Sequence, residues 1–156
     1  MRVVEATERR LAPHAASNRR AQIATVMIVE SDFALRELME RYLSGEGFRV
    51  VSVASADEAA DLIRQHQPAV VMLDVDDTEV DAAAAVARVR SDLIGAAIPL
   101  VVLGSGTPTP DPRKLGAEDC LGKPINWQAM AAMAKKWVRT KGAGSRDRSV
   151  AAGAGS

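Results

Sequence analysis

Short apolar runs that alternate with segments of helical periodicity are the feature that most limits how this chain can fold. Residues 25–29, 69–73 and 98–103 are continuous apolar stretches rich in Val, Leu, Ile and Met. Such runs are typical of strands that are buried on both faces of a sheet. Residues 48–53 and 118–121 are predicted as two further strands, so the sequence indicates five strands.

The segments between the predicted strands carry helix signals. Asp32 is a good N-cap for a first helix, and Ser55 with Glu58 three residues later forms a capping-box pattern for a second. Residues 80–93 form an Ala-rich third helix, and Asn126 caps the last one.

The fourth helix is predicted to be short. Pro108, Pro110 and Pro112 interrupt the segment before Lys123. Proline breaks a helix from inside but is favoured in its first turn. We therefore expect one or two helical turns that begin near Pro112.

This alternation predicts an α/β protein with a doubly wound, five-stranded parallel sheet and helices on both faces, joined by right-handed crossovers. In such folds the functional site lies at the carboxyl ends of the strands. The residues that directly follow each strand are therefore the candidates for function.

Charge is distributed unevenly along the 156 residues. The formal net charge is zero, yet residues 23–134 hold 9 basic and 17 acidic residues, while the segments on either side are basic. We predict a disordered basic arm over residues 1–23, one folded domain over residues 24–140 and a disordered Gly/Ala/Ser tail over residues 141–156.

Composition excludes several classes of protein. The single cysteine, Cys120, is incompatible with a disulfide framework or a cysteine-based zinc site. No stretch approaches the roughly 20 apolar residues of a membrane span, and no secretory signal is evident. These features predict a cytoplasmic protein.

Carboxylates follow two of the predicted strands, and a lysine follows a third. Glu30 comes directly after the first strand, Asp74 and Asp76 after the third, and Lys123 after the fifth. Mg²⁺ prefers such oxygen ligands, and a carboxylate beside it can attack phosphorus. Lysine can then pair with phosphoryl oxygens.

These residues resemble the receiver domain of two-component response regulators, over roughly residues 24–139. The resemblance includes the stretches ESD-x-ALRELMERYL, VVMLD, IPLVVL and, most specifically, GAEDCLGKP. It implies a flavodoxin-like fold that takes a phosphoryl group from a sensor histidine kinase or a histidine phosphotransferase. It also implies a signalling protein, not an enzyme.

The resemblance assigns roles to four residues. Asp74 is similar to the phosphoacceptor, and Lys123 to the lysine that contacts the phosphoryl group. Glu30, Asp74 and the backbone carbonyl of Asp76 correspond to the ligands of Mg²⁺.

Several positions depart from the family pattern. Ser31 stands at the second acidic position and weakens the expected Mg²⁺ site, and Asp32 could compensate, although its role as an N-cap is favoured. Gly104 replaces the usual hydroxyl residue, which Ser105 could substitute only if the loop shifts. Cys120 replaces the aromatic switch residue.

The partners that the resemblance implies are a sensor histidine kinase or a histidine phosphotransferase, and a downstream protein. No DNA-binding output domain is expected, because no helix-turn-helix fits into the segment after the last helix. Two alternatives stay open. One is a phosphorylation-independent pseudo-receiver that acts as an interaction module, and the other is a flavodoxin-like enzyme or nucleotide binder, for which no catalytic or phosphate-loop signature is found.

Overall fold

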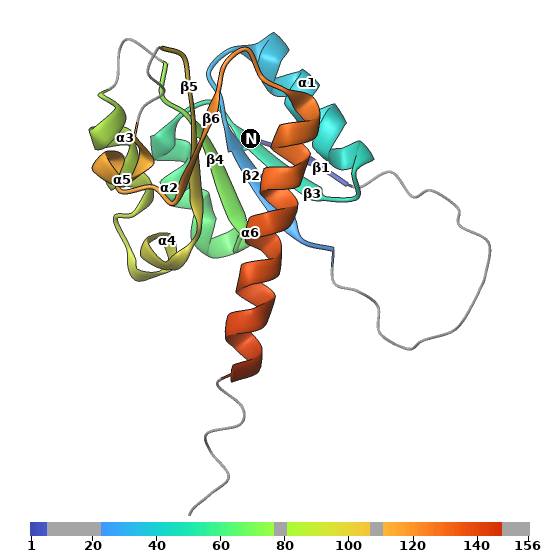
Figure 1. Ribbon diagram of the computed structural model, residues 1–156, viewed down its shortest axis with the longest axis vertical. Helices are drawn as coiled ribbons and strands as arrows, with labels where there is room; N and C mark the ends of the chain where they lie inside the picture. Colours follow the sequence, from blue (N-terminus) through green and yellow to red (C-terminus); the bar gives the residue numbers. More distant parts are fainter. Residues whose placement is uncertain (6–22, 77–80, 107–110, 148–156) are drawn as a thin grey trace, which may run out of the picture.

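The computed structural model describes residues 1–5, 23–76, 81–106 and 111–147, and it shows a twisted sheet between two layers of helices (Figure 1). The strands of the described residues are β1 (Arg2–Val4), β2 (Thr25–Val29), β3 (Arg49–Val53), β4 (Val70–Asp74), β5 (Leu100–Gly104) and β6 (Asp119–Gly122). Their order across the sheet is β1-β3-β2-β4-β5-β6.

The five predicted strands are confirmed as β2 to β6, which run parallel to one another. Of these five strands, β2 comes first along the chain and lies in the middle of the sheet; the chain then moves to β3 on one side and crosses to β4 on the other. This reversal is the switch point of a doubly wound fold, where the carboxyl ends of neighbouring strands open into a crevice.

The predicted sheet of five parallel strands is extended by one further strand at its edge. Residues 2–4 form β1, which pairs antiparallel with the edge of β3 so that Val3 lies opposite Val51. The predicted disordered arm over residues 1–23 is therefore wrong for these three residues, and residues 6–22 lie outside the described part of the chain. A strand of three residues has no periodicity to detect. Instead, it forms because the β3 edge offers unpaired backbone groups and Val3 packs on the core.

The helices of the described residues are α1 (Phe33–Gly45), α2 (Ala56–His66), α3 (Ala82–Val89), α4 (Leu93–Ala97), α5 (Pro112–Leu115) and α6 (Trp127–Asp147). Three predicted N-caps are confirmed. Asp32 accepts from Leu35 N at 2.7 Å. Ser55 accepts from Glu58 N at 3.2 Å, and the Asn126 side chain accepts from Ala129 N at 2.9 Å.

The prediction of a single helix over residues 80–93 is wrong. Helix α3 ends at Val89, and Asp92 starts α4 by accepting from Gly95 N at 2.8 Å. The turn between them brings Gly95 so close to Val89 that a Cβ atom there would lie 2.1 Å from the Val89 carbonyl oxygen. Only glycine permits this approach.

The short fourth helix is confirmed as α5, with Asp111 as its N-cap and Pro112 in its first turn. The last helix is longer than expected. Helix α6 continues to Asp147, so the predicted disordered tail over residues 141–156 is wrong for residues 141–147. No proline interrupts this stretch, and each further residue adds a hydrogen bond to a helix already begun. None of the helices in the described ranges is both long and apolar enough to cross a membrane.

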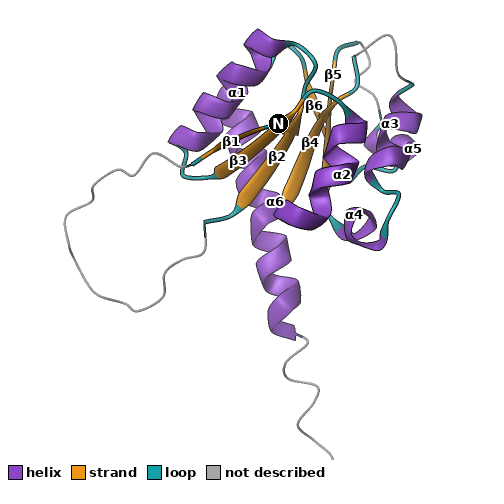
Figure 2. Ribbon diagram, turned by 180° about the vertical axis from the view of Figure 1, so that it is seen from behind, coloured by secondary structure: helices purple, strands orange, loops and turns teal. Residues whose placement is uncertain are grey.

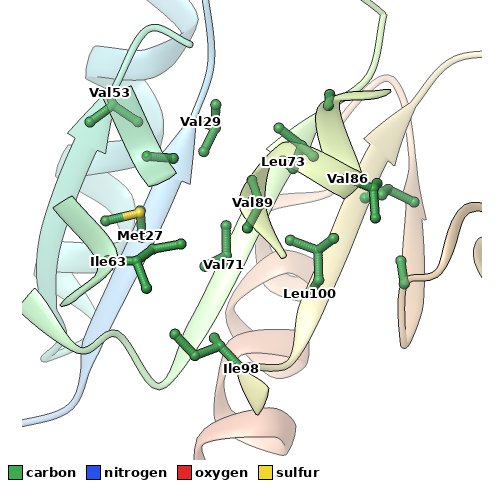
Figure 3. Close-up of a cluster of buried hydrophobic side chains, with 14 of the residues drawn as sticks. Met27, Val29, Val53, Ile63, Val71, Leu73, Val86, Val89, Ile98 and Leu100 are labelled. Carbon is green, nitrogen blue, oxygen red and sulfur yellow. The ribbon is translucent and has the colours of Figure 1, made fainter. Parts of the chain in front are cut away.

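The core consists of two clusters, one on each face of the sheet. In β2, Met27 packs toward α2 and α3, while its neighbour Ile28 packs toward α1 and α6. Figure 2 shows α2 and α3 covering the face opposite α6. On the α2–α3 face, Ile63 and Val89 close over Met27 and the strand residues beside it (Figure 3). This packing fixes the strand ends that carry the candidate residues.

Candidate functional site

Two buried carboxylates and a lysine meet at the carboxyl ends of the parallel strands. Glu30 follows β2 and Asp74 ends β4, and their side chains are 3% and 7% exposed. Lys123 follows β6, and its Nζ atom bonds directly to Asp74 Oδ2. The same atom lies 3.3 Å from Asp76 Oδ2 and 3.9 Å from Glu30 Oε2. The structure thus brings together all four residues to which the resemblance assigns roles.

Backbone contacts between the strands hold these side chains in place. The Lys123 N–H donates to the Gly104 carbonyl oxygen at 3.1 Å and extends the pairing of β6 with β5. The Val75 N–H donates to the Leu103 carbonyl oxygen at 2.9 Å, beyond the end of β4. Asp74 Oδ1 accepts from the Asp76 N–H at 2.7 Å, which orients the carboxylate. These bonds continue the sheet pairing into the site and fix the direction of the Asp74 carboxylate.

Glu30 is held by its own loop. Its Oε1 atom accepts from the Asp32 N–H at 3.0 Å, whereas its Oε2 atom is buried without a hydrogen-bond partner among the described residues. Arg36 on α1 donates to the Glu30 carbonyl oxygen at 2.7 Å and ties the loop to the helix. The buried Oε2 atom leaves a place for a proton or a cation.

The charges of the site depend strongly on one another. Burial and the neighbouring Asp74 carboxyl group raise the pKa of Glu30 to about 7. Burial alone would lower the pKa of Lys123, but its bond to Asp74 and the surrounding carboxylates raise it above the ordinary value. Lys123 is therefore a fixed positive charge, and Glu30 is a group that can gain or lose a proton near neutral pH.

Asp76 binds the loop that follows β5. Its Oδ1 atom accepts from the Ser105 N–H at 2.8 Å, and its Oδ2 atom accepts from the Ser105 hydroxyl. Burial would raise the pKa of Asp76, but the Ser105 bonds and the Lys123 charge lower it. The Asp76 side chain is thus an ionised group fixed between two strand ends.

The residues that depart from the family pattern lie in different parts of the site. Ser31 is exposed and lines, with Asp74 and Ser55, a small cavity of about 60 Å³. The Asp32 carboxylate caps α1, as predicted. Gly104 is buried at the end of β5 and has no side chain to offer. Ser105, the possible substitute, faces Asp76.

Cys120 lies on β6 and is half-buried against the core cluster of the α2–α3 face. Burial and the charges of Asp119 and Asp76 raise the pKa of its thiol. A protonated, packed thiol behaves as a small apolar residue.

Sequence reasoning missed two contacts of the site. The bond from Arg36 to the Glu30 carbonyl has no sequence signal beyond the position of Arg36 in the first turn of α1. The bond between Asp76 and Ser105 joins residues 29 positions apart and follows from the pairing of β4 with β5. A register prediction for these two strands would have found it.

The donor set fits a divalent cation that keeps several waters. Within the described ranges, no three His, Cys, Asp or Glu side chains converge as metal ligands. Glu30 and Asp74 supply two buried carboxylates, and Glu30 Oε2 lacks a donor. Mg²⁺ is commonly bound through one or two carboxylates, with water completing its octahedron.

Known proteins share this fold and this family. Residues 26–135 match the model of the response regulator receiver domain, so the chain belongs to this family. The transcriptional regulatory protein GltR of Pseudomonas aeruginosa is 30% identical over 118 residues, which make up 74% of this chain and 49% of GltR. The chain spans about half the length of the curated relatives it matches.

Two solved structures show the same fold. The receiver domain of the sensor histidine kinase PA1611 of Pseudomonas aeruginosa has a TM-score of 0.66 at 20% identity, over 74% of this chain and 98% of that one. It was solved with a magnesium ion coordinated in its active-site cleft. The chemotaxis response regulator CheY4 of Vibrio cholerae has a TM-score of 0.65 at 21% identity, over 74% and 98%.

Proposed function

We propose that this receiver accepts a phosphoryl group on Asp74 in a two-component phosphorelay and passes the signal on through protein contacts. The observation that carries the proposal is the Asp74 carboxylate, which is buried at the end of β4 and bonded to the Lys123 ammonium. A buried nucleophile paired with one positive charge suits the transfer of an anionic group. Membership of the receiver family supports it independently.

The transfer requires in-line attack on phosphorus. An Asp74 oxygen forms the new O–P bond while the P–N bond of a phosphohistidine breaks, and the electron pair leaves with the imidazole nitrogen, which takes up a proton from water. The product is an acyl phosphate. Lys123 then pairs with a phosphoryl oxygen, because its ammonium already lies against Asp74.

We propose that Glu30, Asp74 and the Asp76 backbone carbonyl hold Mg²⁺, which would neutralise the charge that builds up on the phosphoryl oxygens. The Glu30 Oε2 atom, which is buried and accepts no hydrogen bond from the described residues, supports this assignment. Ser31 in place of a carboxylate leaves one charge fewer for the metal, so the site is expected to bind it weakly.

The phosphodonor is proposed to be a histidine kinase or a histidine phosphotransferase that docks on α1. Phe33 and Leu38 on this helix are 64% and 52% exposed, and Leu38 lines an apolar hollow with Tyr42 and Trp127. Phe33 lines a different hollow, so the apolar surface typical of a protein contact is the one around Leu38. Phe33 is three residues from Glu30, so a partner bound there reaches the acidic site.

A charged residue on α1 should therefore separate protein donors from small ones. We expect Leu38→Glu to slow transfer from a phosphorylated histidine protein by about tenfold, a loss of roughly 1.4 kcal/mol of binding. Its phosphorylation by acetyl phosphate should be unchanged, because Leu38 lies outside the acidic site. Equal rates of transfer from the protein donor to both chains would contradict docking on α1.

The proposed function is tested with acetyl phosphate and Mg²⁺, followed by measurement of the intact mass. The unmodified chain should gain one phosphoryl group and Asp74→Asn none. Asp57→Asn is the matched control, because Asp57 is an exposed carboxylate on α2 that pairs with Arg88. If no donor yields an adduct, the proposal fails and the phosphorylation-independent interaction module takes its place.

A further inference from the structure

The Asp76 carboxylate contacts the same hydrogen-bond donors that would stabilise a phosphoryl group on Asp74. It accepts from the backbone N–H of Ser105 at 2.8 and 3.0 Å and from the Ser105 hydroxyl, and it lies 3.3 Å from Lys123 Nζ. Asp76 follows β4, Ser105 follows β5 and Lys123 follows β6. One side chain thus ties together the ends of three neighbouring strands.

A phosphoryl group on Asp74 would need the same kinds of hydrogen-bond donor and the same positive charge. It carries negative charge and several acceptor oxygens, and it is stabilised by an ammonium and by N–H or O–H donors. Lys123 supplies the ammonium, and Ser105 supplies a hydroxyl at the end of β5, where Gly104 supplies none. In the structure both donors already serve the anion of Asp76.

We infer that Asp76 is a positioning residue that competes with the phosphoryl group for Ser105 and Lys123. The inference rests on the proposed function of Asp74. In the unphosphorylated chain Asp76 holds the loop after β5 close to the site. When the phosphoryl group arrives, it takes Ser105 and Lys123, and the Asp76 side chain is released toward solvent.

Two consequences follow for this receiver. Phosphorylation is slowed, because the bonds of Asp76 must break before Ser105 can turn to the phosphoryl oxygens. The position of the loop after β5 changes little, because Ser105 exchanges one anion for another at nearly the same place. The released Asp76 side chain is then the group that moves most.

A double-mutant cycle tests the competition, with the initial rate of phosphorylation by acetyl phosphate as the readout. We expect Asp76→Ala to react about tenfold faster, the value of one hydrogen bond of roughly 1.4 kcal/mol. The double variant Asp76→Ala with Ser105→Ala should lose most of this gain, because no hydroxyl is left to release. Asp57→Asn, which removes a remote surface charge, should react at the original rate.

Two outcomes of the cycle would overturn the inference. One is an Asp76→Ala rate equal to or below that of the unmodified chain. The other is a gain that persists undiminished in the double variant, since this would show that the Ser105 hydroxyl plays no part in it. If the unmodified chain still gains a phosphoryl group, the proposed function stands even when one of these outcomes overturns the inference.

Amide hydrogen exchange at Ser105 gives a second readout that needs no phosphorylation. The Ser105 N–H donates to both Asp76 oxygens, so its exchange should speed up about tenfold or more in Asp76→Ala. The Lys123 N–H, which donates to Gly104, should keep its protection in the same variant. Equal exchange at Ser105 in the unmodified chain and in Asp76→Ala would show that Asp76 does not hold the loop after β5. This result would overturn the inference whether or not Asp74 is phosphorylated.

Discussion

The Glu30 side chain is buried, lies beside the Asp74 carboxyl group and has one oxygen, Oε2, that accepts no hydrogen bond from the described residues. Burial and Asp74 raise its pKa from the ordinary 4.5 to about 7, so the folded chain binds this proton more tightly than the unfolded chain does. A raised pKa of an acid adds stability below the unfolded value, and this stability is lost as the pH rises through the folded value. Glu30 therefore stabilises the fold in acid and opposes it above neutrality.

The matching prediction compares the unmodified chain with Glu30→Gln, without Mg²⁺. Between about pH 4.5 and about pH 7, the free energy of unfolding of the unmodified chain should fall relative to that of Glu30→Gln, because only the former must ionise a buried carboxyl. Urea unfolding at several pH values measures both curves. A difference that stays constant over this range would show that the Glu30 pKa is not raised.

Ser31 is the residue on which the strength of the metal site is expected to depend. Ser31→Asp should bind Mg²⁺ about tenfold more tightly, because it adds a carboxylate to the same edge of the site, and calorimetric titration measures this. Ser55→Asp is the matched control, since Ser55 lines the same small cavity and Asp can also cap α2. If both variants tighten binding equally, added charge and not ligation is the cause.

At the scale of single residues, the sequence placed the candidate site well. Glu30, Asp74 and Lys123 each follow a strand, and parallel strands bring their carboxyl ends to one edge. The partners of these residues could not be predicted in the same way. Whether Ser105 faces the phosphoacceptor or Asp76 depends on how β4 and β5 align, and no local pattern encodes that alignment.

Elements with strong local signals were predicted, and elements defined by tertiary contacts were not. Helix α1 follows the capping Asp32 and the short α5 begins at Pro112, and both signals are visible in the sequence. Strand β1 consists of three residues and exists through its pairing with β3. The break between α3 and α4 depends on the contact of Gly95 with the Val89 carbonyl, which an Ala-rich sequence does not indicate.

Arg90 stabilises the turn between α3 and α4. Its guanidinium donates to the carbonyl oxygens of Gly95, Ala96, Ile98 and Gly116 and to Glu118. Glu118 in turn accepts from the Leu100 N–H at 2.6 Å, at the start of β5. One side chain thus links α3, α4 and the turn before β6.

We expect Arg90→Met to lower the free energy of unfolding by roughly 2 to 3 kcal/mol, because it strips several carbonyls and Glu118 of their donor. Arg64→Met is the control. Arg64 is exposed and forms a single ion pair with Asp92 at 3.4 Å, so its loss should cost about 0.5 kcal/mol or less. Urea unfolding compares the two, and equal losses would contradict the role of Arg90 as a link.

At the scale of the whole molecule, topology assembles the site from distant parts of the chain. Lys123 is 49 residues from Asp74, and 93 residues separate it from Glu30. The strand order places β2, β4 and β5 side by side, with β6 next to β5, so the acids and the lysine face one crevice. Family membership, fold and site geometry all support the proposal that Asp74 receives the phosphoryl group.

The most direct test locates the phosphoryl group along the chain. Borohydride reduces an acyl phosphate to an alcohol, so a phosphorylated aspartate becomes homoserine and is permanently marked. After treatment with acetyl phosphate, Mg²⁺ and borohydride, peptide mass spectrometry should find homoserine at position 74, and Asp74→Asn should yield none. Homoserine at Asp76 or at another aspartate, or no mark at all, would contradict the account.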